Sequence, residues 1–131
     1  MSTEGAKYEQ AMYMASGGRC YCARAGKLEE ALSYAAEARE IGEAMGDARL
    51  LAWCAMESEP YMYEGLGEQV IRVGEEGKPV AWEIGEWSVI FWISAWLGIA
   101  YLKVRRLEDA RRVLRRALKE SQARSAAPWS I

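Results

Sequence analysis

The chain contains 131 residues with a formal net charge of −2, and 51% of its residues are hydrophobic against 27% charged. That length is enough for one domain with a hydrophobic core, and the composition excludes a disordered or fibrous chain. The sequence has no histidine, which excludes the common catalytic triads and the usual zinc sites, because both depend on an imidazole. We therefore expect neither a bound metal ion nor a cofactor.

The three cysteines do not indicate a disulfide framework. Their number is odd, and Cys20 and Cys22 lack the C-x-x-C spacing of redox and zinc motifs. Residues two apart on a helix also point in different directions. We interpret Cys20, Cys22 and Cys54 as small apolar residues in a reducing cytoplasm. The N-terminal sequence MSTEGAKYEQ lacks the basic and apolar regions of a secretion signal, which favours the same compartment.

The first half of the chain predicts three helices, over residues 5–25, 28–45 and 48–64. Gly26 and Gly46 follow the first two, where glycine accepts the left-handed conformation that ends many helices. Asp47 is a good N-cap for the third helix, because its carboxylate can accept a bond from a free backbone N–H. Pro60 removes a backbone donor within the third helix and should kink it.

The second half predicts three more helices: one that starts near residue 68, one over 86–104 and one over 107–123. The first of these contains Gly74, Gly77 and Pro79, so we expect it to be short or broken. The tail, residues 124–131, is expected to be frayed.

The run WSVIFWISAWLGIAYL, residues 87–102, contains no charged residue. Its 16 residues are fewer than the roughly 20 that a membrane-spanning helix needs. It also contains Ser88, Ser94 and Gly98, and an amphipathic segment follows it directly. We therefore predict a helix that is buried on several sides and no membrane span.

The sequence repeats itself with a step of 39 to 40 residues. The segment AMGDARLLAW begins 39 residues before EIGEWSVIFW, and both contain glycine, an acid, an apolar stretch and tryptophan. A period of this size is typical of stacked helical hairpins, because one hairpin cannot bury its apolar face without a neighbour. We predict an all-α domain over residues 1–131, a superhelical stack of three antiparallel hairpins with repeats of about 5–46, 47–85 and 86–123.

These hairpins resemble the tetratricopeptide repeat over about residues 12–123. The third matches the family pattern most closely, with Leu97, Gly98, Tyr101, Leu107, Ala110, Leu114 and Ala117 in the expected order. The first hairpin departs from the pattern at Arg19, where the family has a small residue. The second departs at Glu57, where the family has a core leucine, and at Gly77, where it has alanine.

The longer step and the glycine–acid turns are similar to the repeat domains of large bacterial regulators, such as transcription-activating ATPases and multidomain nucleotide cyclases. No G-x-x-x-x-G-K-[ST] loop is present, so the chain lacks the ATPase machinery. The resemblance implies a non-enzymatic interaction or sensor module in signalling, which binds a protein or peptide partner.

In that family the first helix of each hairpin lines a groove. Carried over to this chain, the resemblance implies a binding surface of aromatic and apolar residues with a few charges. Its members are Tyr13, Cys20, Arg24, Glu59, Met62, Tyr63, Trp92, Ile99 and Lys103. Such a mixture suits a peptide or a helix laid in the groove. The apolar residues of the last hairpin can equally be covered by a neighbouring hairpin or by a second copy of the chain, as in a homodimer.

Two further functions stay open. The kinked third helix and the broken fourth could form a pocket for a small molecule. Glu57 and Glu59, close to tyrosines, could perform acid–base chemistry, but both lie on one helix rather than across a cleft. A kink with solvated acids is the simpler interpretation, in which Glu57 pairs with a cation such as Arg19 or faces outward.

The last helix is strongly basic. Residues 105–124 contain eight Lys or Arg and three acids, a net charge of +5, so the rest of the chain carries −7. Phosphate groups of a nucleic acid could bind such a stripe. Aromatic residues are not interleaved with the arginines and the chain is acidic overall, which favours a solvated outer face over a nucleic-acid surface.

Overall fold

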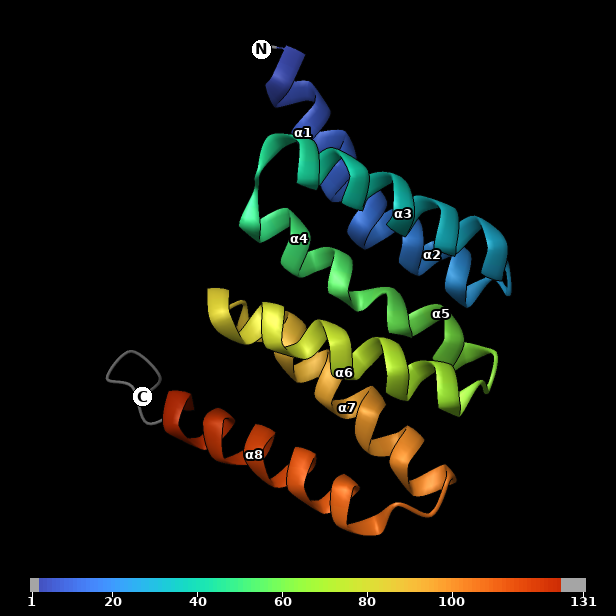
Figure 1. Ribbon diagram of the computed structural model, residues 1–131, viewed down its shortest axis with the longest axis vertical. Coiled ribbons are helices and arrows are strands. Elements are labelled where there is room, and N and C mark those ends of the chain that lie inside the picture. Colours follow the sequence, from blue (N-terminus) through green and yellow to red (C-terminus); the bar gives the residue numbers. More distant parts are fainter. Residues whose placement is uncertain (1–2, 126–131) are drawn as a thin grey trace.

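The computed structural model describes residues 3–125, and none of these residues lies in a strand. Six helical rods follow one another through short turns (Figure 1). The rods are α1 (Thr3–Tyr13) with η1 (Met14–Gly18) and α2 (Arg19–Arg24); α3 (Leu28–Met45); α4 (Ala48–Cys54) with η2 (Ala55–Glu57) and α5 (Ser58–Tyr63); α6 (Gly67–Ile84); α7 (Trp87–Lys103); and α8 (Leu107–Ser125). The prediction of an all-α fold is confirmed for this range.

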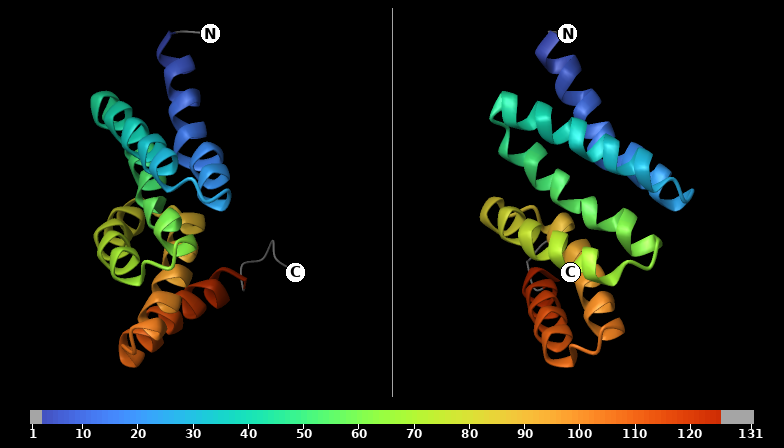
Figure 2. Two further views of the ribbon diagram at one scale, coloured as in Figure 1. Left: turned by 90° about the vertical axis from the view of Figure 1, so that its right-hand side faces the viewer. Right: turned by 45° about the vertical axis from the view of Figure 1, so that its right-hand side comes forward.

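Each rod packs against its neighbours in the chain. Helix α2 lies on α3, α3 on α4, α5 on α6, α6 on α7 and α7 on α8. Further contacts join α2 to α5 and α5 to α7, so the first, third and fifth rods share one side of the molecule. We call this side the inner face. Figure 2 shows the same order from two other directions, with α1 and α8 at opposite ends.

The five turns share one backbone conformation. A residue with positive φ follows each of the first five rods: Gly26, Gly46, Gly65, Gly85 and Arg105. After each of them, the next residue donates its backbone N–H to a carbonyl five residues earlier, as Asp47 does to Gly42 at 3.0 Å. Successive positions are 19 or 20 residues apart, so two turns span the 39–40-residue step of the sequence repeat.

Arg105 is the only non-glycine residue with positive φ among the residues described, at φ 67°. A left-handed conformation strains a residue that has a Cβ atom. Arg105→Gly should therefore raise the free energy of unfolding by about 0.5–1 kcal/mol, measured by urea titration. Arg115→Gly, in the exposed middle of α8, is the matched control and should lower that free energy by about 1 kcal/mol. A loss of stability in Arg105→Gly would contradict the strain.

The expectation that the fourth helix is short or broken is wrong, because α6 continues unbroken from Gly67 to Ile84. Its glycines allow close packing. A Cβ atom at Gly77 would lie 2.8 Å from the Cβ of Ala55, and one at Gly74 would lie 2.8 Å from Leu97. The contacts with η2 and α7 thus compensate for the low helix propensity of glycine. Pro79 lies inside the helix, where it removes one donor without ending it.

The other helix boundaries agree with the sequence within a few residues. Gly46 ends α3, and the carboxylate of Asp47 accepts a hydrogen bond from the backbone N–H of Leu50 at 2.8 Å, as predicted for an N-cap. The third rod is interrupted by the 3₁₀ turn η2, just before Pro60. Helix α8 extends to Ser125, two residues beyond its predicted end, and most of the expected frayed tail lies outside the described residues.

Helix α7 lies at the centre of the main hydrophobic core. Its residues Val89, Ile90, Ile93 and Leu97 are fully buried and pack with apolar residues of α6 and α8. The prediction of a helix buried on several sides is therefore confirmed. One face remains open, where Trp92, Ile99 and Leu102 are 54%, 44% and 50% exposed. Within residues 3–125, none of the helices combines the length and apolarity that crossing a bilayer requires.

Candidate functional site

The inner face contains a cavity of about 330 Å³, which we call the aromatic cavity. All three rods of that face contribute to it: η1 and α2, then the α4–α5 rod, and α7. Its lining residues are Ser16, Gly17, Arg19, Cys20, Arg24, Trp53, Met56, Glu59, Tyr63, Trp92 and Trp96. A cavity of this size, with apolar walls and a few polar groups, is typical of ligand sites in proteins.

A buried ion pair forms the polar part of the wall. The Arg19 side chain donates to Oε1 of Glu59 from Nε at 3.2 Å and from Nη2 at 3.1 Å. Its Nη1 donates to the backbone carbonyl of Ala15, and the Cys20 thiol lies 3.7 Å from the other Glu59 oxygen. Both charged side chains are at most 5% exposed. Burial of two charges is tolerated here because each has several hydrogen-bond partners.

The π-helical turn η1 helps to position Arg19. A π turn has one residue more than an α turn, so it rotates the helix that follows it. Arg19 follows this turn directly, and its side chain reaches across to Glu59 in the third rod.

Aromatic rings form most of the remaining wall. Trp92 and Trp96 lie on one face of α7, with ring centroids 5.9 Å apart, and Trp53 and Tyr63 contribute from the third rod. Trp96 is buried, whereas Trp92 and Tyr63 are about half exposed. Arg24 is exposed, and nearby Cys20 and Tyr63 raise its pKa above the ordinary value. Since Arg19 and Glu59 neutralise each other, Arg24 gives the cavity a net positive charge.

The structure brings together five of the nine predicted site residues. The residues that line the aromatic cavity are Cys20, Arg24, Glu59, Tyr63 and Trp92. Three others, Met62, Ile99 and Lys103, line a small separate hollow beside the turn between α5 and α6. Tyr13 lies outside both and packs edge-on against Tyr34, with a centroid distance of 6.5 Å.

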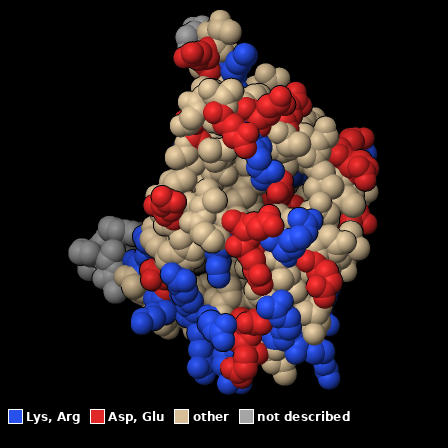
Figure 3. Space-filling view, viewed as in Figure 1, with Lys and Arg blue, Asp and Glu red and all other residues tan. Residues whose placement is uncertain are grey.

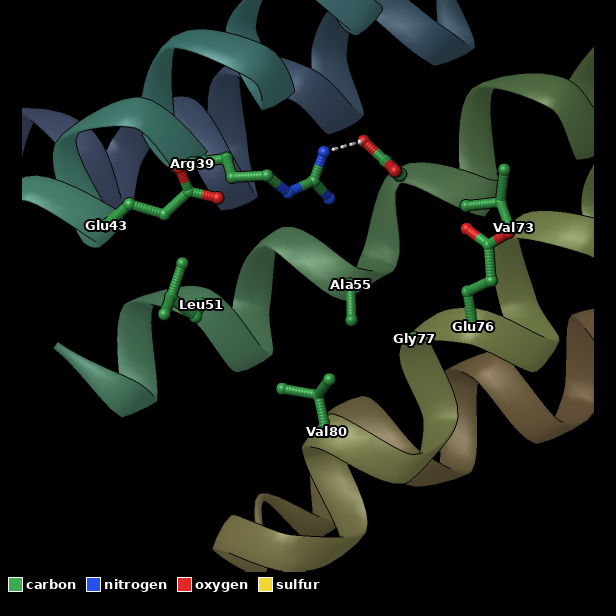
Figure 4. A pocket seen from close by; sticks show the side chains of 9 residues that line it. Arg39, Glu43, Leu51, Ala55, Val73, Glu76, Gly77 and Val80 are labelled. Atoms are coloured by element: carbon green, nitrogen blue, oxygen red, sulfur yellow. Dashed lines mark ion pairs between the residues drawn. The ribbon is translucent and has the colours of Figure 1, made fainter. Parts of the chain in front are cut away.

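The structure separates the two glutamates that were considered together. Glu59 lines the aromatic cavity, whereas Glu57 pairs with Arg39 at 2.9 Å and lines another cavity of about 330 Å³ between α3, α4 and α6 (Figure 4). Of the two alternatives for Glu57, the structure shows a pair with a cation, Arg39 in place of Arg19. The interpretation of both acids as solvated is wrong for Glu59, which is buried and paired with Arg19. The two carboxylates do not share a cleft, so this arrangement offers no acid–base pair of the kind considered from the sequence.

Sequence reasoning missed Arg19, Trp53, Met56 and Trp96 as cavity residues. Arg19 carried a usable signal, because a charged residue stood at a position where the repeat pattern has a small one. The side of the helix on which Trp53 and Trp96 lie depends on the local rotation of each rod. That rotation changes at η1, which has no clear signature in the sequence, and at η2, near which Pro60 predicts a kink.

The cysteines are free, as the sequence indicated. Cys22 and Cys54 are buried, whereas Cys20 is partly accessible at the aromatic cavity. Burial raises the pKa of the Cys54 thiol to about 11, against the opposite effect of Arg39. Cys54 is therefore protonated at neutral pH. No group of three or more Cys, Asp or Glu side chains within residues 3–125 is arranged to hold a metal ion.

Comparisons with known proteins give no match. No protein-family model matches the chain, and neither a curated protein nor a solved structure is significantly similar to it.

Proposed function

We propose that the protein is a non-enzymatic binding module, a superhelical stack of three tetratricopeptide-like hairpins whose inner face holds a segment of a partner protein. The aromatic cavity is the observation that carries this proposal. It combines tryptophan and tyrosine walls with a buried ion pair and an exposed arginine. Large aromatic side chains around an apolar pocket supply most of the binding energy in many interfaces.

The exposed face of α7 favours an elongated partner over a compact one. Trp92 lines the aromatic cavity, and Ile99 lines the small hollow beside the α5–α6 turn. The two residues are seven positions apart on one helix, so they lie on the same side about 10 Å from each other. Both are about half exposed. A peptide or helix with two apolar side chains at that spacing would fill the cavity and the hollow together.

The resemblance to the repeat domains of bacterial regulators supports a role in cytoplasmic signalling, where such a module senses a partner. A small-molecule sensor is the second candidate function. It is favoured by the position of the aromatic cavity, which lies against the interrupted third rod. A second copy of the chain is a further candidate occupant of the exposed α7 face, and sedimentation over a range of protein concentrations tests it.

Selection from a displayed peptide library tests the proposal. We expect the protein to enrich peptides with two apolar or aromatic residues and to bind them directly in a calorimetric titration. Trp92→Ala and Tyr63→Ala should each weaken the selected peptide at least about thirtyfold, because they truncate central aromatic contacts. Tyr21→Ala is the matched control: Tyr21 is 70% exposed and does not line the cavity, so its loss should have little effect.

The same variants separate the two candidate functions. Enriched peptides that bind wild type and Trp92→Ala equally well would contradict binding at the inner face. A thermal-shift screen of metabolites covers the alternative. If a compound stabilises wild type but not Trp92→Ala and no peptide is enriched, the ligand of the aromatic cavity is a small molecule rather than a peptide.

A further inference from the structure

A further cavity, less than half the volume of the aromatic cavity, is lined by residues of α6, α7 and α8. It has a volume of about 140 Å³, and we call it the basic cavity. Its lining residues are Lys78, Tyr101, Asp109, Arg112, Val113 and Arg116. Lys and Arg side chains gather at the end of the molecule that α8 forms, as Figure 3 shows in blue. The basic cavity shares no lining residue with the aromatic cavity, and its role does not depend on the function proposed for the inner face.

The carboxylates near the basic cavity are already engaged. Asp109 accepts hydrogen bonds from Arg106 at 2.8 Å and from Arg112 at 3.2 Å, one on each oxygen. Glu75 accepts a hydrogen bond from the Tyr101 hydroxyl at 2.5 Å and lies 3.6 Å from Arg106. The lining therefore contains three cations and a single anion, and that anion is held by two arginines.

Lys78 has no ion-pair partner within residues 3–125, although it is partly buried. Its pKa is lowered, first by burial and then by the charge of Arg116, while Glu75 acts in the opposite direction. Partial burial of an ammonium group without a counter-ion is unfavourable. An anion in the basic cavity would remove that penalty.

Arg116 is held in place before any ligand binds. Its guanidinium carbon lies 4.0 Å from the centre of the Trp82 ring. When a guanidinium lies over the face of an aromatic ring, its N–H groups still point outward in its own plane and can donate hydrogen bonds. Arg112 is also held in place, in its case by a hydrogen bond to Asp109. Two oriented guanidinium groups and one ammonium thus surround a space of the size of one small anion.

We propose that the basic cavity binds the phosphate group of a phosphate monoester. A phosphate dianion has oxygens for both arginines and for Lys78, and charge-assisted bonds of this kind are strong. A phosphorylated side chain of a protein and a small phosphorylated compound share this chemistry. A nucleic acid is a poorer fit, because its diester phosphates would bind the exposed arginines along α8 rather than an enclosed group on α6.

A titration of backbone amide shifts by nuclear magnetic resonance tests the proposal. The probes are inorganic phosphate and O-phosphoserine, each added at constant ionic strength, with sodium chloride as the control. We expect saturable shifts around residues 78 and 109–116. Lys78→Met keeps the apolar stem and removes the charge, and it should weaken phosphate binding at least about tenfold. Lys119→Met removes the same charge from an exposed position of α8 outside the cavity and should change binding less than twofold.

The amide spectrum also shows whether each variant is folded, so loss of binding is separable from loss of structure. Equal weakening by Lys78→Met and Lys119→Met, or shifts that chloride reproduces, would overturn the site in favour of general charge screening. Tighter binding of a short duplex DNA, with shifts along all of α8, would overturn it in favour of nucleic acid. If phosphate binds at the cavity, a phosphoserine peptide that binds more tightly than O-phosphoserine identifies a protein source, and equal affinities identify a small compound.

Discussion

Replacement of Arg19 by methionine should lower the free energy of unfolding by about 3–5 kcal/mol in urea titrations. The substitution keeps an apolar side chain in the space but removes both guanidinium hydrogen bonds to Glu59. The Glu59 carboxylate would remain buried, at 5% exposure, without a charge partner. A buried, unpaired charge is one of the most destabilising features that a single substitution can create.

A second ion pair supplies the matched control. Arg39 and Glu57 lie 2.9 Å apart, but their side chains are 37% and 23% exposed. Water screens such a pair, so Arg39→Met should cost at most about 1 kcal/mol. The double variant Arg19→Met with Glu59→Leu should recover most of the stability lost in Arg19→Met, because no buried charge remains. Equal effects of Arg19→Met and Arg39→Met would contradict the buried pair.

Gly77→Ala should lower the free energy of unfolding by about 1–3 kcal/mol. Alanine in a helix is otherwise more stable than glycine by about 0.5–1 kcal/mol. Here the added Cβ would lie 2.8 Å from the Cβ of Ala55 and 3.1 Å from the Ala55 carbonyl oxygen. Rotation of a side chain cannot relieve a contact with backbone atoms, so α6 would have to move away from η2.

Gly67→Ala is the control on the same helix. An added Cβ at Gly67 would lie 3.6 Å from the nearest side-chain atom, which belongs to Val104, an ordinary van der Waals distance. This variant should be neutral or more stable than wild type by up to about 1 kcal/mol. If the Gly77→Ala variant is as stable as the Gly67→Ala variant, α6 does not pack closely against η2. Thermal or urea unfolding followed by circular dichroism measures both variants.

Local signals were enough to predict the helices, because each turn carries its own chemistry. Gly46 with Asp47 fixed the boundary between α3 and α4 correctly. The same local signals misjudged α6, where Gly74 and Gly77 pack against residues far away in the sequence. A glycine that weakens an isolated helix can strengthen a packed one, and single-sequence propensity does not contain that difference.

The candidate site was predictable only in part, for a related reason. Five of the nine residues predicted for the groove line one cavity, because the 39–40-residue step places equivalent positions of neighbouring hairpins close together: Cys20, Arg24, Glu59, Tyr63 and Trp92. Their role in binding stays a prediction. Arg19, in the Arg19–Glu59 pair, directly follows the π turn η1, which the helical pattern of the sequence does not predict. The sequence therefore assigned Arg24 and Glu59 to the site but not Arg19, the buried partner of Glu59.

Alkylation of Cys20 tests the proposed binding site most directly. Cys20 lines the aromatic cavity and is partly accessible, whereas Cys22 and Cys54 are buried. Iodoacetamide should therefore modify Cys20 first, as read by mass spectrometry of the digested protein. A saturating amount of a peptide selected on the wild type should slow that modification at least about tenfold in wild type but not in Trp92→Ala, since occupancy above 90% blocks the thiol. A peptide that binds tightly and leaves the rate of Cys20 alkylation unchanged would contradict binding in the aromatic cavity.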